Sequence, residues 1–143
     1  MSLYGLSQRT TATAAASASW EVRSAATNKP KIMEVGISQN AATAGVFGFG
    51  RPAAIGVTPT APQNFVAEGD AGAPTSLSTA AVAWGTGPTV PTNFNRRVSC
   101  PASIGAGVIW TFPRGFDLAV TNSSVVWILA TAPVCDVWAV VDE

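Results

Sequence analysis

The sequence predicts an all-β protein, an antiparallel β-sandwich of about eight strands with jelly-roll-like topology and an extended N-terminal arm. Threonine, valine, glycine, proline and serine are abundant, whereas leucine and lysine, which helices favour, are scarce. No stretch repeats apolar residues at the three- and four-residue spacing of an amphipathic helix. Short apolar runs instead alternate with clusters of turn residues, and most connections are too short for a crossover helix.

The N-terminal segment differs from the rest because it lacks clear strand alternation. We expect residues 1–17 to form an arm outside a single β-sandwich domain of residues 18–143. The arm is rich in small polar residues and cannot bury enough apolar area to order itself alone. Leu3, Tyr4 and Leu6 near its tip are the side chains that would anchor it on a partner surface.

Strands are predicted wherever an apolar or alternating run ends at glycine, proline or asparagine. These runs are residues 18–25, 31–38, 45–49, 77–84, 94–99, 108–112, 116–120, 124–130 and 134–141. Met33, Val35 and Ile37 are expected to share one face of the second run. Residues 58–74 carry three prolines and form the longest predicted loop, which suits a jelly roll. An immunoglobulin-like sandwich is the alternative, although the separation of the two cysteines is short for it.

The final strand has two unlike faces. One face is small and apolar, and it is predicted to be core: Cys135, Val137, Ala139 and Val141. The opposite face mixes Trp138 and Val140 with two carboxylates, which fits the centre and rim of a subunit interface. We therefore expect Trp138 and Val140 to be buried between subunits. The alternative is that a loop of the same chain covers Trp138.

The other large or sulfur-containing side chains are interpreted as core residues. Four tryptophans recur late in the chain, and the general interpretation is that they fill the sandwich, although the final strand favours an interface for the last of them: Trp84, Trp110, Trp127 and Trp138. Cys100 and Cys135 are expected to be small buried hydrophobes that need no disulfide, and whether they pair is left open.

The amino-acid composition argues against several classes of function. Only 11% of the residues are charged, against roughly 25% in a typical domain, so we expect much of the surface to be covered by other subunits. The net charge of +0 provides no basic field for nucleic acid. Histidine is absent, which removes the commonest general base and metal ligand. We therefore expect no enzyme activity, catalytic residue, cofactor, metal or small-molecule substrate.

The acidic residues provide the remaining candidates for chemistry. The candidates for a hydrolytic carboxylate pair are Glu34, Glu68, Asp70, Asp117 and Asp136. Glu68 and Asp70 lie in the long loop, where a calcium site is also conceivable. Nothing else marks a pair or an alternating ligand set, so we interpret them as solvated loop charges.

No membrane segment is predicted. The longest apolar run, residues 125–130, is far shorter than the roughly 18 residues that a membrane helix needs. The N-terminus does not have the pattern of a signal peptide, so we expect synthesis in a cytoplasm.

Several segments resemble small β-proteins encoded among the virion genes of tailed bacteriophages. They read WEVR at 20–23, IMEVGI at 32–37, GRPAAIGV at 50–57, AWGT at 83–86, IWTFPRG at 109–115 and VWAVVDE at 137–143. The resemblance covers most of the chain from Trp20 onward. It implies a virion protein on the capsid surface, a decoration or cement protein that forms a homotrimer and binds the major capsid protein.

Two other functions remain open at this stage. One is a different place in the virion, as a tail or neck component. The other is a carbohydrate-binding module that stacks sugars on exposed tryptophan or tyrosine side chains.

Overall fold

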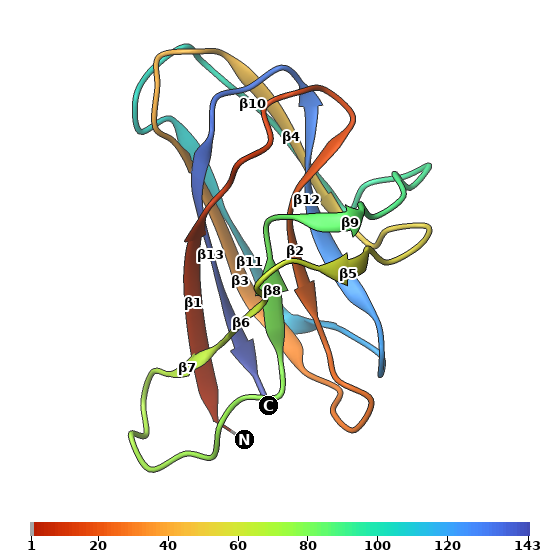
Figure 1. Cartoon of the computed structure of the whole chain (residues 1–143). Helices are drawn as coiled ribbons and strands as arrows, with labels where there is room; N and C mark the ends of the chain where they lie inside the picture. Colours follow the sequence, from red (N-terminus) through yellow and green to blue (C-terminus); the bar gives the residue numbers. More distant parts are fainter. Residues whose placement is uncertain (1) are drawn as a thin grey trace.

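The computed structural model describes residues 2–143, and this part of the chain forms thirteen strands in three antiparallel sheets without a helix (Figure 1). The eight longer strands are β1 (Leu3–Arg9), β2 (Ser17–Arg23), β3 (Lys31–Gln39), β4 (Gly45–Gly50), β10 (Arg96–Cys100), β11 (Gly107–Asp117), β12 (Ser123–Ala130) and β13 (Cys135–Asp142). The five shorter strands are β5 (Val57–Pro59), β6 (Gln63–Asn64), β7 (Val66–Ala67), β8 (Thr79–Ala81) and β9 (Trp84–Thr86). The predicted all-β, antiparallel class is confirmed, and the sheets are consistent with a β-sandwich.

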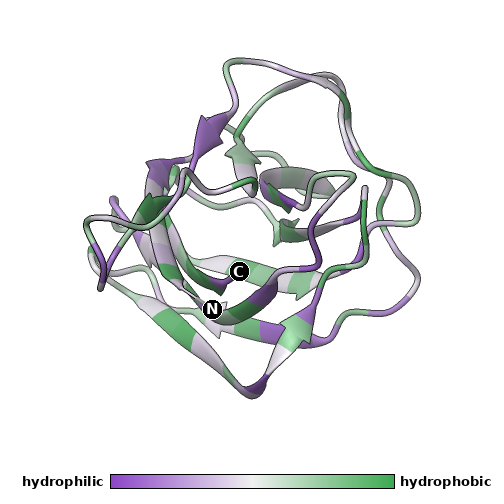
Figure 2. Ribbon diagram, turned by 90° about the horizontal axis from the view of Figure 1, so that it is seen from below, coloured by the Kyte–Doolittle hydropathy of each residue, from purple (hydrophilic) through white to green (hydrophobic). Residues whose placement is uncertain are grey.

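The long strands pair in a nested order. β1 pairs with β13, β2 with β12, β3 with β11 and β4 with β10. Two further pairings, β3 with β13 and β4 with β12, divide these strands between two sheets. The first sheet has the order β11-β3-β13-β1-β7, and the second has the order β10-β4-β12-β2-β8-β6. The two ends of the chain consequently lie side by side (Figure 2), and Ser2 and Glu143 exchange backbone hydrogen bonds of 2.8 and 3.1 Å.

The core lies between the two sheets and consists of the inward side chains of each long strand. It includes Trp20, Ile37, Phe47, Phe49, Trp110, Val126 and Val137. The predicted core face of the last strand is confirmed, because Cys135, Val137, Ala139 and Val141 are each at most 1% exposed. Cys100 and Cys135 are buried free thiols.

The prediction that Met33, Val35 and Ile37 share one face of β3 is wrong for Met33, because the strand carries a bulge. Its pairing with β13 shifts register between Val140 and Val141. Val35 and Ile37 face the core, but Ile32 is fully buried there and Met33 is only half-buried. An extra residue in one strand reverses the side-chain alternation on one side of the bulge.

The predicted N-terminal arm is wrong, and so is the domain boundary at residue 17. Residues 3–9 form β1, which lies between β13 and β7 inside the first sheet. Tyr4 is 2% exposed, and its hydroxyl donates to the carbonyl of Pro74 at 3.0 Å. Leu6 is half-buried against the core, and only Leu3 is exposed. β1 is ordered by its backbone pairing with β13, a partner from the far end of the chain that local alternation does not reveal.

Parts of the segment between β4 and β10 cover the outer face of the second sheet, whereas its strands β6, β7 and β8 extend the edges of the two sheets. Within this segment, β5 and β9 form a small two-stranded sheet (Figure 1). Glu21 of β2 is fully buried beneath it and accepts hydrogen bonds from the Trp84 indole at 2.6 Å and from the Gly56 amide at 3.2 Å.

The tryptophans do not all fill the sandwich, contrary to the expectation. Among the four late ones, Trp110 belongs to the core cluster. Trp127 is fully buried, but its strand partner is Gly48, and Phe94 of the covering segment packs against Gly48. Trp84 belongs to the covering segment itself. Trp138 points outward from the first sheet. Strand alternation gives each strand two faces but does not tell which surface covers each one.

Candidate functional site

The outer face of the first sheet carries the candidate site. Strand register places residues of different strands side by side in rows across this face. One row contains Ile109, Gly36, Trp138 and Ser7, and the next contains Thr111, Glu34, Val140, Gly5 and Val66. Ile109 is 55% exposed and Val66 is 67% exposed. We call the apolar side chains Ile109, Trp138, Val140 and Val66 the tryptophan stripe.

Trp138 lies flat on the sheet because its neighbour has no side chain. A Cβ atom at Gly36 would lie 2.0 Å from atoms Cε2 and Cζ2 of the indole. The indole Nε1 donates to Oε1 of Glu34 at 2.9 Å, which fixes the ring in its plane. One face of the indole therefore rests on the strand, and the opposite face is turned away from the sheet.

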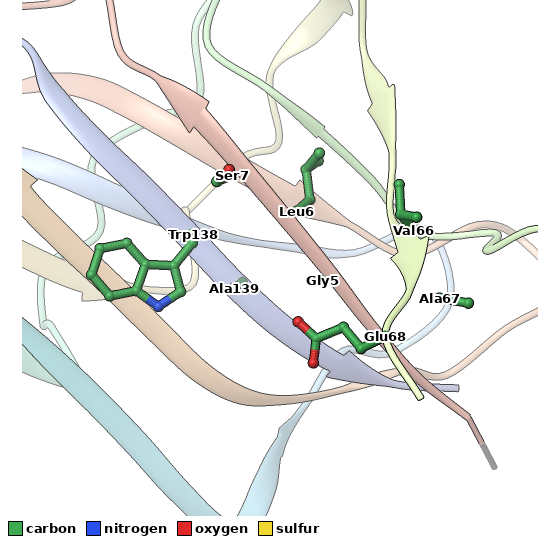
Figure 3. A pocket seen from close by; sticks show the side chains of 8 residues that line it. All are labelled: Gly5, Leu6, Ser7, Val66, Ala67, Glu68, Trp138 and Ala139. Carbon is green, nitrogen blue, oxygen red and sulfur yellow. The ribbon is translucent and has the colours of Figure 1, made fainter. Parts of the chain in front are cut away.

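A shallow depression of about 400 Å³ lies beside this indole (Figure 3). Its lining comes from β1, β13 and the segment that begins at β7: Gly5, Leu6, Ser7, Val66, Ala67, Glu68, Trp138 and Ala139. Glu68 reaches over Gly5, where an added Cβ would lie 2.0 Å from its Oε1. An apolar ring thus stands opposite a carboxylate across a floor of backbone, an arrangement able to contact a protein surface or a sugar.

The predicted interface residues occupy this face. Trp138 and Val140 point outward and are half-buried within the single chain. Their burial between subunits stays a prediction. Two of the three predicted anchors are not available on the surface, because Tyr4 points into the chain's own core and Leu6 packs against that core. Of the three, Leu3 alone is exposed, at 48%.

Glu34 and Glu68 lie beside Trp138 on the outer face of the first sheet, and each of the other three acidic candidates has a separate partner. Asp136 accepts two hydrogen bonds from Arg9, at 2.8 and 3.0 Å, and this pairing lowers the pKa of its carboxyl. Asp117 lies 3.9 Å from the ammonium of Lys31, and Asp70 accepts the Gly72 amide at 2.9 Å. Within residues 2–143, no three histidine, cysteine or acidic side chains are grouped to hold a metal ion. Nor does that part of the chain contain a helix long and apolar enough to span a membrane.

Sequence reasoning missed the neighbours that shape the site. Gly5 and Gly36 leave room for Glu68 and Trp138, and Ile109 extends the apolar surface to the edge strand. A glycine within an alternating strand is a known sign of close approach by another group. That sign is present in IMEVGI, but the residue that approaches Gly36 comes from another strand.

Comparisons of the chain with protein-family models, with curated proteins and with solved structures gave no match.

Proposed function

We propose that this protein is a non-enzymatic structural protein of a tailed-bacteriophage virion, a capsid decoration or cement protein that assembles as a homotrimer and binds the major capsid protein. The observation that carries the proposal is the tryptophan stripe. It places two strongly exposed aliphatic side chains and an indole in adjacent rows of one sheet face. Exposed apolar side chains gathered on one face in this way are typical of an interaction site.

The stripe has the physical properties of a binding anchor. Trp138 is already held by Gly36 and Glu34, so little side-chain entropy is lost when a partner covers it. Tryptophan side chains near the centre of an interface often contribute most of its binding energy.

The order of the strands supports a jelly roll as the finer description of the sandwich. The eight strands of five or more residues pair from first with last to fourth with fifth. Jelly rolls have eight strands in two sheets and occur in viral capsid and lectin domains. This topology is compatible with a virion protein but does not by itself define the function.

Replacing Trp138 tests the proposal. We expect Trp138→Ala to weaken self-association by about 2 kcal/mol, or roughly thirtyfold in dissociation constant. Val57→Ala, at an exposed position of the β5–β9 sheet, is the matched control and should assemble as the wild type does. Sedimentation velocity over a concentration series measures both. A Trp138→Ala protein that stays fully oligomeric at low micromolar concentration would contradict the proposal.

A test of the virion assignment requires phage particles. Electron cryomicroscopy of phage particles made with and without the protein should show its density on the head shell. Density at the tail or neck would instead support the second virion location. Particles that are the same in both preparations would overturn the virion assignment.

A carbohydrate-binding module is the second candidate function, and a specific observation favours it. The outward ring face of Trp138 stands beside the Glu68 carboxylate and the Ser7 hydroxyl, around the depression in Figure 3. Sugars stack on such rings and donate hydrogen bonds to such oxygens. A glycan array separates the candidates, because binding lost in Trp138→Ala from a monomeric wild-type protein would support the module.

A further inference from the structure

The charges of this charge-poor chain are segregated. Five of its eight cations lie around the end of β11, where they line two adjoining depressions of about 380 and 440 Å³. We call this surface the arginine face: Lys29, Lys31, Arg51, Arg96 and Arg114. One carboxylate, that of Asp117, belongs to it, so the surface has a net positive charge.

Two of the three guanidinium groups of this face, those of Arg51 and Arg96, lie over aromatic rings. Arg51 lies with its Cζ 4.0 Å from the ring centroid of Phe116, and it donates to the Asp117 carbonyl at 2.5 Å. Arg96 lies 5.2 Å from the ring centroid of Phe112. Within residues 2–143, none of the arginines of this face forms an ion pair with a carboxylate. They are therefore positioned for an acidic partner.

An acidic surface is present on the same molecule, around the tryptophan stripe. Glu34, Glu68 and Asp142 belong to the strands and the β7 segment that form that outer face. None of the three forms an ion pair within the described part of the chain. The stripe and these carboxylates together are called the tryptophan face. It extends over the outer face of the first sheet from β11 to β7, whereas the arginine face lies around the end of β11 and along β10 at the sheet edges.

We propose that the arginine face of one copy docks on the tryptophan face of the next copy. This inference rests on the proposed homotrimer, because a closed trimer joins its subunits through two different patches. Charge complementarity selects the pair: Arg96 and Arg114 meet Glu68 and Asp142, and a guanidinium covers the free ring of Trp138. Two tryptophan faces placed together would instead bring like carboxylates into contact, which is unfavourable.

Charge reversal on each face tests the proposal. The arginine-face variant is Arg96→Glu with Arg114→Glu, and the acidic variant is Glu68→Lys with Asp142→Lys. Each leaves Glu34 and Arg51 in place, because those side chains hold Trp138 and the Asp117 carbonyl. Arg97→Glu is the matched control, since Arg97 is exposed on β10 but lines neither depression.

Each double variant alone should self-associate at least tenfold more weakly than the wild type and the control. It should therefore be monomeric at concentrations at which those two proteins are oligomeric. An equimolar mixture of the two should associate again, because the intact faces are complementary and the two reversed faces are complementary as well, whereas contacts within either variant bring like charges together. Sedimentation with one partner labelled measures this, and far-ultraviolet circular dichroism confirms that both are folded. If Arg96→Glu disturbs folding, Arg114→Glu alone replaces the arginine-face variant.

The outcomes separate this inference from the proposed function. A wild-type oligomer that neither double variant weakens would overturn the inference and leave the proposed function standing. A mixture that stays monomeric would likewise exclude the pairing of these two faces. A wild-type protein that is monomeric at every concentration would overturn the proposed self-association, and the inference with it.

Discussion

Glu21 is the most constrained charge in the molecule. Its side chain is fully buried and accepts hydrogen bonds from three groups: the Arg23 guanidinium, the Trp84 indole and the Gly56 amide. Arg23 also donates to the Gly56 carbonyl. A buried carboxylate is tolerable only when it is paired and hydrogen-bonded in this way. The network fastens the segment between β4 and β10 onto the second sheet.

Replacing Glu21 should release that segment. In Glu21→Gln, the amide cannot neutralise Arg23, so we expect unfolding to become easier by about 2–3 kcal/mol. Urea denaturation measures the change, and hydrogen exchange should rise first in β5 and β9. Glu68→Gln, at an exposed carboxylate, should stay within roughly 0.5 kcal/mol of the wild type. Equal stabilities of the two variants would contradict this account.

Cys135 makes stability depend on alkaline pH. Burial, together with the neighbouring Cys100 and Asp136, raises the pKa of its thiol to about 12. In the unfolded chain a thiol titrates near a pKa of about 8.5. Between these values the folded state keeps the proton and the unfolded state loses it. The free energy of unfolding should therefore fall as the pH rises above about 9.

The part of this pH dependence that comes from Cys135 should disappear when its thiol is removed. At about pH 10, the wild type is expected to have lost about 2 kcal/mol relative to neutral pH through this thiol. Cys135→Ala should lack that part of the loss, although its smaller side chain lowers stability at every pH. Denaturant melts at the two pH values give the difference. Parallel losses in both proteins would exclude Cys135 as the source.

At the scale of elements, β1 is the strand whose role is least evident from its own sequence. It adds a backbone ladder between β13 and β7, and it contributes Tyr4 to the core. Gln8, on the same strand, accepts the indole N–H of the buried Trp20 at 2.7 Å. β1 is thus ordered by partners that lie elsewhere in the sequence.

Changes in β1 should therefore affect folding. Tyr4→Ala removes a buried ring and a hydroxyl that bonds Pro74, so we expect a loss of about 3 kcal/mol or more. Leu3→Ala, at an exposed position of the same strand, should cost little. Thermal and urea melts compare the two. A Tyr4→Ala protein as stable as Leu3→Ala would show that β1 is dispensable, as an arm would be.

At the scale of the whole molecule, the nested pairing makes nearly every long strand depend on a distant one. β13 lies in the middle of the first sheet, between β3 and β1. The first sheet cannot form completely until β13 is present to pair with both β3 and β1. Folds dominated by such non-local pairing are slow to form, because loop closure precedes the contacts that offset it.

Removing the last strand should therefore abolish the fold. A chain that ends at residue 133 lacks β13, which leaves β1 and β3 without their shared neighbour. We expect this chain to show no cooperative melt, and the full chain to refold over milliseconds to seconds. Stopped-flow fluorescence follows the five tryptophans. A cooperative melt of the truncated chain would show that the second sheet folds by itself.

The sequence alone determined the class and most long strands. Alternation is a local property, so it located β2, β3, β4, β12 and β13 to within two residues and identified the core face of β13. It also supplied Trp138 and Val140 as outward residues, and this orientation agrees with the fold.

Only the tertiary structure decided what each face meets. It placed β1 beside β13, moved Ile32 into the core through a bulge, and buried Glu21 beneath a segment that begins about thirty residues later in the chain. It likewise gathered Arg51, Arg96 and Arg114 at one edge and laid Trp138 over Gly36. The physical reason is that strand pairing and sheet covering join residues far apart in the chain, whereas periodicity records only near neighbours.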